Sequence, residues 1–314
     1  MMPDDSRPIH YCHRTMFKNL ILFRIVPEWT PNSDAADTAA EAAQFTPCGA
    51  TQATSAGWVP PRGEAHGPLV ELVAGQWLLK LQTETKILPA QVVAAKVDEL
   101  ADQIEHQTGR KPGRKQRKEL KEQAALELLP QAFAKRSACL VWIDPKARLA
   151  MIEAGSMKRA EEVVTALVKT IPGFGLQALG TTISPAGAMA LWLVSGEPPA
   201  HFSIDRECEL KSPDELKAMV RYTRHNLDMD EVREHIKAGK VPTKLAMTWM
   251  GRVSFVLTDT MSIKRIGFDD VVLESKSQKE VPDEHFDADA AIATGELSQL
   301  IPDLLEAMGG ELGG

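Results

Sequence analysis

The spacing of apolar residues changes several times along the chain, and it predicts a fold that mixes strands with helices. Residues 17–26 are rich in Leu, Ile, Phe and Val and predict a strand, and the stretch rich in Asp, Ala and Glu that follows predicts a helix to about residue 43. Residues 47–61 contain several prolines and glycines and predict a loop-rich stretch with Trp58 buried in it. Residues 69–81 have strand character, with a turn at Gly75.

After Pro89 the apolar spacing becomes that of an amphipathic helix. Apolar residues recur at intervals of four, three and four positions, at Val93, Val97, Leu100 and Ile104. Gly109 is typical of a helix C-terminus, and Pro112 suits the first turn of a second helix, which runs to about residue 129. The second helix has an apolar line of its own, at Leu120, Ala124 and Leu128. The pattern therefore predicts a projecting helical hairpin.

Beyond the hairpin, strands and helices continue to the end of the chain. Strands are predicted at residues 139–143, 149–152, 245–249, 254–258 and 262–266, with Gly251 as a hairpin turn. Helices are predicted at residues 158–170, 189–194, 213–222, 230–238 and 288–308. Residues 1–15 lack the apolar stretch of a signal peptide and are expected to be a disordered extension. The expected fold class is α+β.

Positive charge is concentrated at the turn of the predicted hairpin, although the chain as a whole is acidic. The formal net charge is -7, whereas seven of the twelve residues at positions 110–121 are basic and one is acidic. The seven are Arg110, Lys111, Arg114, Lys115, Arg117, Lys118 and Lys121. An acidic protein that gathers its cations in one place is typical of focal binding to a polyanion.

The spacing of these cations favours a partner over a merely solvated helix face, which is the alternative interpretation. Arg114, Lys118 and Lys121 fall at positions i, i+4 and i+7 of the second helix, so they repel one another along one face. Cations at a helix N-terminus also oppose the helix dipole. Aromatic residues make up 5% of the chain and none lies within the basic run, so phosphates rather than bases are the expected contacts.

The sequence lacks the common motifs for nucleotide binding, metal binding and nucleophilic catalysis. It contains no Gly-x-x-x-x-Gly-Lys-Ser/Thr phosphate loop, no His-Glu-x-x-His and no Gly-x-Ser-x-Gly. The cysteines are far apart and form no Cys-x-x-Cys pair, which suits reduced thiols in a cytosol better than a zinc site or disulfides. No segment reaches the roughly 18 apolar residues of a membrane helix. We expect no metal, no cofactor and no enzymatic activity.

Two rival functions stay open. A metal-dependent nuclease would need convergent carboxylates, and acidic residues do gather near the C-terminal helix, at Asp269, Asp270, Asp283, Glu284, Asp287 and Asp289. Acidic residues that precede a helix more commonly cap its N-terminus. The basic run could also dock an acidic protein partner, in which case the chain would be a protein-interaction module.

Short strings along the chain resemble the RdgC family of bacterial recombination-associated proteins. They occur in order from residue 16 to the C-terminus, so the resemblance covers nearly the whole chain. Among them are Phe45-Thr46-Pro47-Cys48-Gly49, Gly57-Trp58-Val59-Pro60-Pro61, Lys86-Ile87-Leu88-Pro89, Trp142-Ile143-Asp144, Glu209-Leu210-Lys211-Ser212 and Phe286-Asp287-Ala288-Asp289.

This resemblance implies a non-enzymatic DNA-binding protein without sequence preference. It implies a horseshoe-shaped subunit with a central αβ region (residues 16–86 and 136–172), a helical tip (87–135) and an α+β base (173–314). Two subunits would form a ring dimer around double- or single-stranded DNA in the cytoplasm, associated with the nucleoid, and would restrain strand exchange by RecA. Phe133 then matches the dimer contact at the tip, and Lys86 and Arg224 join the seven cations of the basic run as DNA contacts.

The chain departs from the family pattern at three places. Gln131 stands where the family often has Arg, which removes one cation near the expected contact. Pro112 and Gly113 interrupt the basic run, so the start of the second helix could be shifted. Residues 1–15 match no part of the family pattern. The first two departures bear on which single cation matters most.

Overall fold

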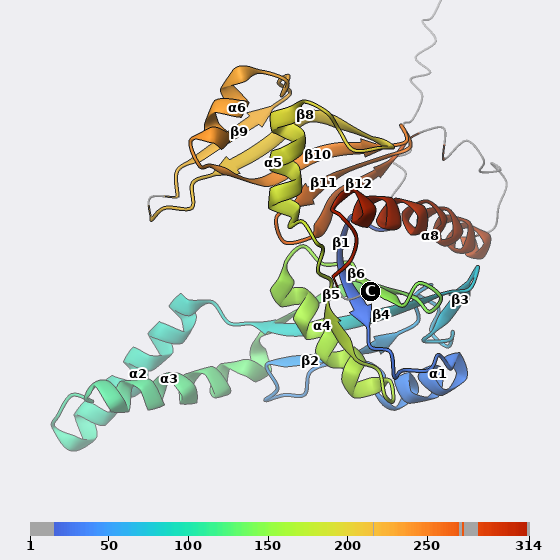
Figure 1. Cartoon of the computed structure of the whole chain (residues 1–314). Coiled ribbons are helices and arrows are strands. Elements are labelled where there is room, and N and C mark those ends of the chain that lie inside the picture. The colour runs from blue at the N-terminus through green and yellow to red at the C-terminus, as the bar shows by residue number, and fades with distance from the viewer. Residues whose placement is uncertain (1–15, 216, 270–271, 273–281, 313–314) are drawn as a thin grey trace, which may run out of the picture. The chain divides into compact units, whose positions relative to one another are not determined.

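The structure is a computed structural model, and it describes residues 16–215, 217–269, 272 and 282–312. The chain forms two compact units. Unit 1 comprises Met1–Arg24, Leu149–Ala160 and Gln177–Gly314, and unit 2 comprises Ile25–Arg148 and Glu161–Leu176. Each unit contains helices and antiparallel strands (Figure 1), so the predicted α+β class is confirmed.

Unit 2 is built on strands in the order β2-β4-β5, all antiparallel, with bounds β2 (Thr54–Val59), β4 (Gln76–Ile87) and β5 (Phe133–Asp144). The short β3 (Glu71–Val73) pairs with the beginning of β4 through the turn at Gly75, as predicted. Trp58 and Trp142 are buried in this sheet. The Trp58 Nε1 donates to Thr170 Oγ1 at 2.8 Å, so the apolar burial of the ring leaves no unpaired indole nitrogen.

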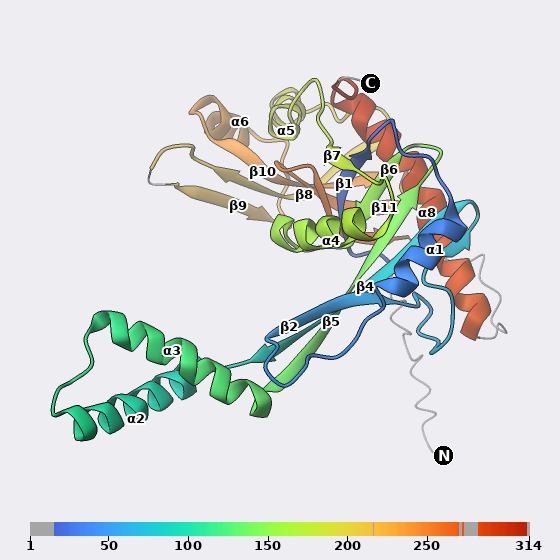
Figure 2. The ribbon, with the colours of Figure 1, turned by 90° about the horizontal axis from the view of Figure 1, so that it is seen from below.

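Helices complete unit 2. The first is α1 (Ser33–Ala42), where the Asn32 side chain accepts a hydrogen bond from Ala35 N and caps the N-terminus. Between β4 and β5 the chain forms α2 (Ala90–Thr108), α3 (Arg114–Leu128) and a 3-10 turn, η1 (Leu129–Gln131). Figure 2 shows α2 and α3 side by side, beyond the ends of β4 and β5. The predicted helical hairpin is confirmed.

Unit 1 contains a larger antiparallel sheet in the order β6-β1-β12-β11-β10-β8-β9. Its strands are β1 (Asn19–Ile25), β6 (Leu149–Ile152), β8 (Phe202–Lys211), β9 (Met219–Thr223), β10 (Val241–Trp249), β11 (Val253–Thr258) and β12 (Ser262–Phe268). Gly251, in the left-handed region at φ 65°, closes the predicted β10–β11 hairpin. The strand β9 is at one edge of this sheet.

Among the described residues, the helices of unit 1 include α5 (Pro185–Ser195), α6 (Asp230–Lys237) and α8 (Pro282–Ala307). Helix α8 is joined to the β10–β11 hairpin by a hydrogen bond from Trp249 Nε1 to Asp303 Oδ2 at 2.8 Å. Two further elements lie where the chain passes between the units, α4 (Met157–Thr170) and β7 (Leu176–Ala178). No helix among the described residues combines the length and the apolar character that a membrane crossing requires.

Outside the hairpin, three predictions of local structure were wrong. The described residues among 213–222 form no helix, because β9 (Met219–Thr223) pairs with β8 and Tyr222 is buried there. Residues 47–61 include strand β2, although Trp58 is buried as predicted. The last helix begins at Pro282, before residue 288, so the acidic residues from Asp283 onward lie inside its first turns. The predicted extension at residues 1–15 lies outside the described residues.

Candidate nucleic-acid interface

The α2–α3 hairpin is held together by a thin apolar seam. Val93 and Ala101 from α2 and Leu120 and Ala124 from α3 are buried, whereas the other residues of the two helices are half-buried or exposed. At the turn, Gly109 adopts the left-handed conformation at φ 68° and its N–H bonds to Glu105 O at 2.8 Å, as expected of a helix C-terminus. Because small and apolar residues occupy the seam, the charged residues all remain on the outside.

The second helix starts later than the sequence pattern suggested. Pro112 lies before the helix, Gly113 is the N-cap residue, and α3 begins at Arg114. The first turn of α3 therefore contains Arg114 and Lys115 and no acidic residue, and no side chain caps it. Positive charges at this end oppose the helix dipole, so a bound anion would relieve an unfavourable arrangement.

All seven cations of the basic run are exposed, and the structure brings them together on this hairpin. Two of them have a carboxylate nearby: Arg117 Nη2 lies 2.9 Å from Asp98 Oδ1, and Lys111 Nζ lies 3.9 Å from Glu105 Oε2. Both pairs are solvent-exposed, and such pairs contribute little to stability. Within the described part of the chain the other five cations form no ion pair, namely Arg110, Arg114, Lys115, Lys118 and Lys121.

Lys86 lies at the end of β4 nearest the hairpin, and its Nζ donates to Gly49 O at 2.8 Å and Ala50 O at 2.7 Å. These bonds fix the ammonium group against a loop of the same unit. Lys86 is half-buried and is therefore less available to a polyanion than the cations of the hairpin.

A cation that sequence reasoning missed lies on β5, two positions along the β4–β5 ladder from Lys86. Arg136 is directly opposite Glu84 across β4 and β5, and its Nε donates to Glu84 Oε2 at 2.6 Å. That bond, together with a second one from Cys48 N at 2.8 Å, lowers the pKa of the Glu84 carboxyl. The Arg136 side chain stays exposed and lies over the Phe45 ring. Only the strand register reveals this pair, because its members are 52 positions apart.

Arg224 lies in unit 1, directly after β9, and it is not part of the hairpin. Its backbone is in the left-handed region at φ 57°, which is uncommon for a non-glycine residue and is favoured where neighbouring contacts hold it. The next residue supplies such a contact, since His225 N donates to Arg206 O at 3.1 Å. The Arg224 side chain is exposed and so could reach a polyanion.

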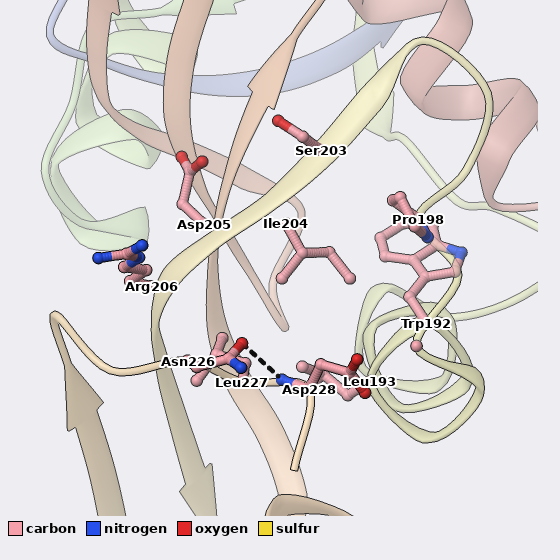
Figure 3. Close-up of a pocket in the computed structure, with 11 residues that line it drawn as sticks. Trp192, Leu193, Pro198, Ser203, Ile204, Asp205, Arg206, Asn226, Leu227 and Asp228 are labelled. Atoms are coloured by element: carbon pink, nitrogen blue, oxygen red, sulfur yellow. Dashed lines mark hydrogen bonds between the residues drawn. The ribbon is translucent and has the colours of Figure 1, made fainter.

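A pocket of about 310 Å³ lies beside this loop (Figure 3). Its apolar wall includes Trp192, and Figure 3 shows Asp205 and Arg206 on the side away from that ring. The acidic groups of the pocket are already engaged: Asp205 Oδ2 accepts from Thr248 Oγ1 at 2.9 Å, and Asp228 is paired with Arg233. With groups of both signs, this pocket does not extend the cationic surface.

Phe133 is the first residue of β5 and is 88% exposed, the largest exposed fraction among the large apolar side chains of the described residues. It is directly opposite Ile87 on β4, which is also exposed. Val92 and Leu126, on the adjacent helices, are exposed as well. The exposed pair of Phe133 and Ile87 is an apolar surface of the kind that suits a protein contact.

Only some of the carboxylates of the rival nuclease belong to the described residues, and these do not form a metal-binding group. Asp270 and the side chains of Asp283 and Glu284 lie outside the described residues. Asp287 and Asp289 are on α8, which is far from the hairpin in sequence. The described residues contain no group of three or more His, Cys, Asp or Glu side chains that could hold a metal ion.

Comparisons with known proteins point to a single family, and the match covers nearly the whole chain. A family model described as "Putative exonuclease, RdgC" matches residues 15–311. A protein of Dechloromonas aromatica named recombination-associated protein RdgC is 45% identical over 300 residues, which is 94% of this chain and 98% of that protein. Proteins with the same name from Herminiimonas arsenicoxydans and Bordetella pertussis are each 42% identical over 296 residues, with the same coverage. The chain belongs to the RdgC family.

Proposed function

We propose that this protein is a non-enzymatic DNA-binding protein that holds DNA by its phosphates, without sequence preference. One observation carries the proposal: seven exposed cations lie on the α2–α3 hairpin of a chain whose net charge is -7, and five of them form no ion pair with a described residue. No aromatic residue lies among them, so backbone contacts to either double- or single-stranded DNA are favoured over base reading.

The family supports a role in recombination, because the relatives are named recombination-associated proteins. We propose that each subunit is a horseshoe with the hairpin as its tip, and that two subunits close into a ring dimer with a cationic hole. An acidic exterior would keep such a ring soluble, while its cations face the enclosed DNA. By occupying DNA, the ring would limit strand exchange by RecA in the nucleoid of the cytoplasm.

Affinity for DNA is expected to fall steeply with salt and to be similar for unrelated sequences. Each neutralised phosphate contributes about -0.9 to the slope of log K against log salt concentration, so four to seven contacts give a slope between about -3.6 and -6.3. Fluorescence anisotropy with two short duplexes of different sequence, over a series of salt concentrations, measures this slope. A flat slope, or no binding at low salt, contradicts the proposal.

The description of the matching family as an exonuclease favours a second candidate function, a nuclease that uses the acidic residues around α8. Incubation of the protein with end-labelled duplex and Mg²⁺ or Mn²⁺ separates the two. A DNA-binding protein without catalysis leaves the label in full-length DNA. Release of labelled nucleotides that is lost in the variant Asp287→Asn/Asp289→Asn would replace the proposal with the nuclease.

The dimer is expected to depend on Phe133. Because this side chain is exposed in the single chain, Phe133→Asp should leave the fold intact and weaken self-association by at least about ten-fold, as is usual for a central aromatic contact. Sedimentation velocity over a concentration series measures the change. Leu72→Asp is the matched control, since Leu72 is also exposed but pairs with the other end of β4. Equal association of both variants and the wild type would contradict the contact.

A further inference from the structure

A second group of cations lies on one face of the sheet in unit 1, away from the hairpin in sequence. Side chains alternate along a strand, so Glu207, Glu209 and Lys211 of β8 share a face. Arg221 of β9 is directly opposite Glu209 on one side, and Lys244 of β10 is opposite it on the other. Glu209 therefore lies between two cations from neighbouring strands.

Glu209 is bonded through both of its carboxylate oxygens. The Oε2 atom accepts from Arg221 Nε at 3.1 Å, from Arg221 Nη2 and from Lys244 Nζ at 3.0 Å. The Oε1 atom accepts from Thr243 Oγ1 at 2.9 Å. Burial by itself raises the pKa of this carboxyl, but the bonds from Arg221, Lys244 and Thr243 outweigh it and lower the pKa to about 2. Glu209 is thus a permanent anion at physiological pH.

The two cations are far more exposed than the carboxylate that holds them. The side chain of Glu209 is 7% exposed, whereas those of Arg221 and Lys244 are 57% and 39% exposed. A guanidinium has five N–H donors and an ammonium has three. Arg221 donates two of its N–H groups to Glu209, and Lys244 donates one. Their remaining N–H groups make no bond to a described residue. Solvent therefore meets donors of Arg221 and Lys244 that Glu209 holds in place.

The rest of this face of the sheet also combines exposed cations with carboxylates that are already bonded. Its cations are Lys211, Arg221, Lys244 and Arg265, and its carboxylates are Asp205, Glu207 and Glu209. Each carboxylate is already bonded, Glu207 to Arg265 at 2.8 Å and Asp205 to Thr248. The side chain of Glu207 is also less exposed than that of Arg265. Positive charge is in excess, and it lies outermost.

We propose that this face, centred on Arg221 and Lys244, is a second phosphate-binding surface for DNA, and that Glu209 is the positioning residue that orients both cations. The inference rests on the proposed function, which it extends from the hairpin of unit 2 to the sheet of unit 1. A guanidinium held at one edge by a carboxylate keeps its other edge in a fixed direction, which suits the paired oxygens of a phosphate.

Another arginine–carboxylate ion pair in unit 1 differs from the group around Glu209. Arg252, at the β10–β11 turn, donates Nε and Nη2 to the two oxygens of Glu296 on α8. This pair contains one cation for one carboxylate, and it joins a turn to a helix. It therefore has no excess charge and a plain structural role, so Arg252→Gln serves as a control.

The test compares the triple variant Glu209→Gln/Arg221→Ala/Lys244→Ala with Arg252→Gln. Each changes the net charge by one unit in the same direction, and the triple variant leaves no buried carboxylate without a partner. Anisotropy with a short duplex over a salt series should show affinity on the order of ten-fold weaker for the triple variant, with a slope shallower by about 1.8 for two lost phosphate contacts. Arg252→Gln should match the wild type. Circular dichroism verifies the fold of each variant.

The single variant Glu209→Gln tests the positioning role. If only net charge mattered, removing this anion would tighten binding, whereas loss of the fixed orientation weakens it. Weaker binding supports positioning, and unchanged or tighter binding overturns it. If the triple variant binds DNA as tightly as Arg252→Gln, the second surface is refuted and the hairpin alone carries the proposed function. If the wild-type protein does not bind DNA, the proposed function itself is refuted, whatever the variants show.

Discussion

DNA binding should be abolished, with the fold intact, when four cations of α3 are replaced by glutamate: Arg114, Lys115, Arg117 and Lys118. All four side chains are exposed, and the described structure gives only one of them an ion pair, Arg117 with Asp98. Loss of four phosphate contacts weakens binding on the order of a thousand-fold at about 0.1 M salt, and the new negative charges add repulsion. Anisotropy at low salt measures the loss.

The fold should tolerate this change for a specific reason. The first turn of α3 has cations at the positive end of the helix dipole and no acidic residue, so glutamate there is more favourable than the natural arginine or lysine. The apolar seam at Leu120 and Ala124 is untouched. Thermal unfolding is therefore expected at an unchanged or slightly higher temperature.

A control with the same change in net charge separates local from general effects. Lys146, Lys158, Lys169 and Lys237 are exposed and scattered over several elements, so their replacement by glutamate lowers the charge of the whole protein equally. This control should weaken binding far less than the hairpin variant. Similar losses in both variants would mean that overall charge, and not the hairpin, controls the affinity.

The hairpin could be predicted from the sequence because everything that specifies it is local. Helical spacing, a glycine at the end of α2 and a dense run of cations all fall within about forty residues. Phe133 could be singled out for the same reason, since it directly follows the hairpin. The exact start of α3 could not, because Pro112 fits either the first turn of a helix or the loop before it.

The cations on the sheets could not be predicted, because their setting depends on strand register. Arg136 and Glu84 become neighbours only when β4 pairs with β5, and Arg221 meets Glu209 only when β9 pairs with β8. The sequence pattern even favoured a helix over residues 213–222. Pairing at the sheet edge and the burial of Tyr222 overrode that local preference.

The prediction of a loop-rich stretch at residues 47–61 missed strand β2 for a related reason. Gly57 and the prolines nearby are turn signals when taken alone. In the fold, Gly57 serves a close approach between two segments of backbone: a Cβ atom there would lie 2.5 Å from both the N and the Cα of Phe45. The hydrogen bonds on either side confirm how tightly these segments run together, with Phe45 N to Trp58 O at 2.9 Å and Trp58 N to Ala43 O at 3.0 Å.

Gly57→Ala is therefore expected to destabilise the protein by about 3 kcal/mol or more, because neither backbone segment can move without breaking these bonds or exposing Trp58. Urea denaturation measures the free energy of unfolding. The matched control is Gly295→Ala, at an exposed position inside α8 with open space around the new methyl group, which should stabilise by about 0.5–1 kcal/mol. Equal stability of Gly57→Ala and the wild type would contradict the close approach. The substitution should also disturb Arg136, a cation of unit 2. The segment that Gly57 holds in place continues to Cys48, and the Cys48 N–H bonds to Glu84, which in turn orients Arg136.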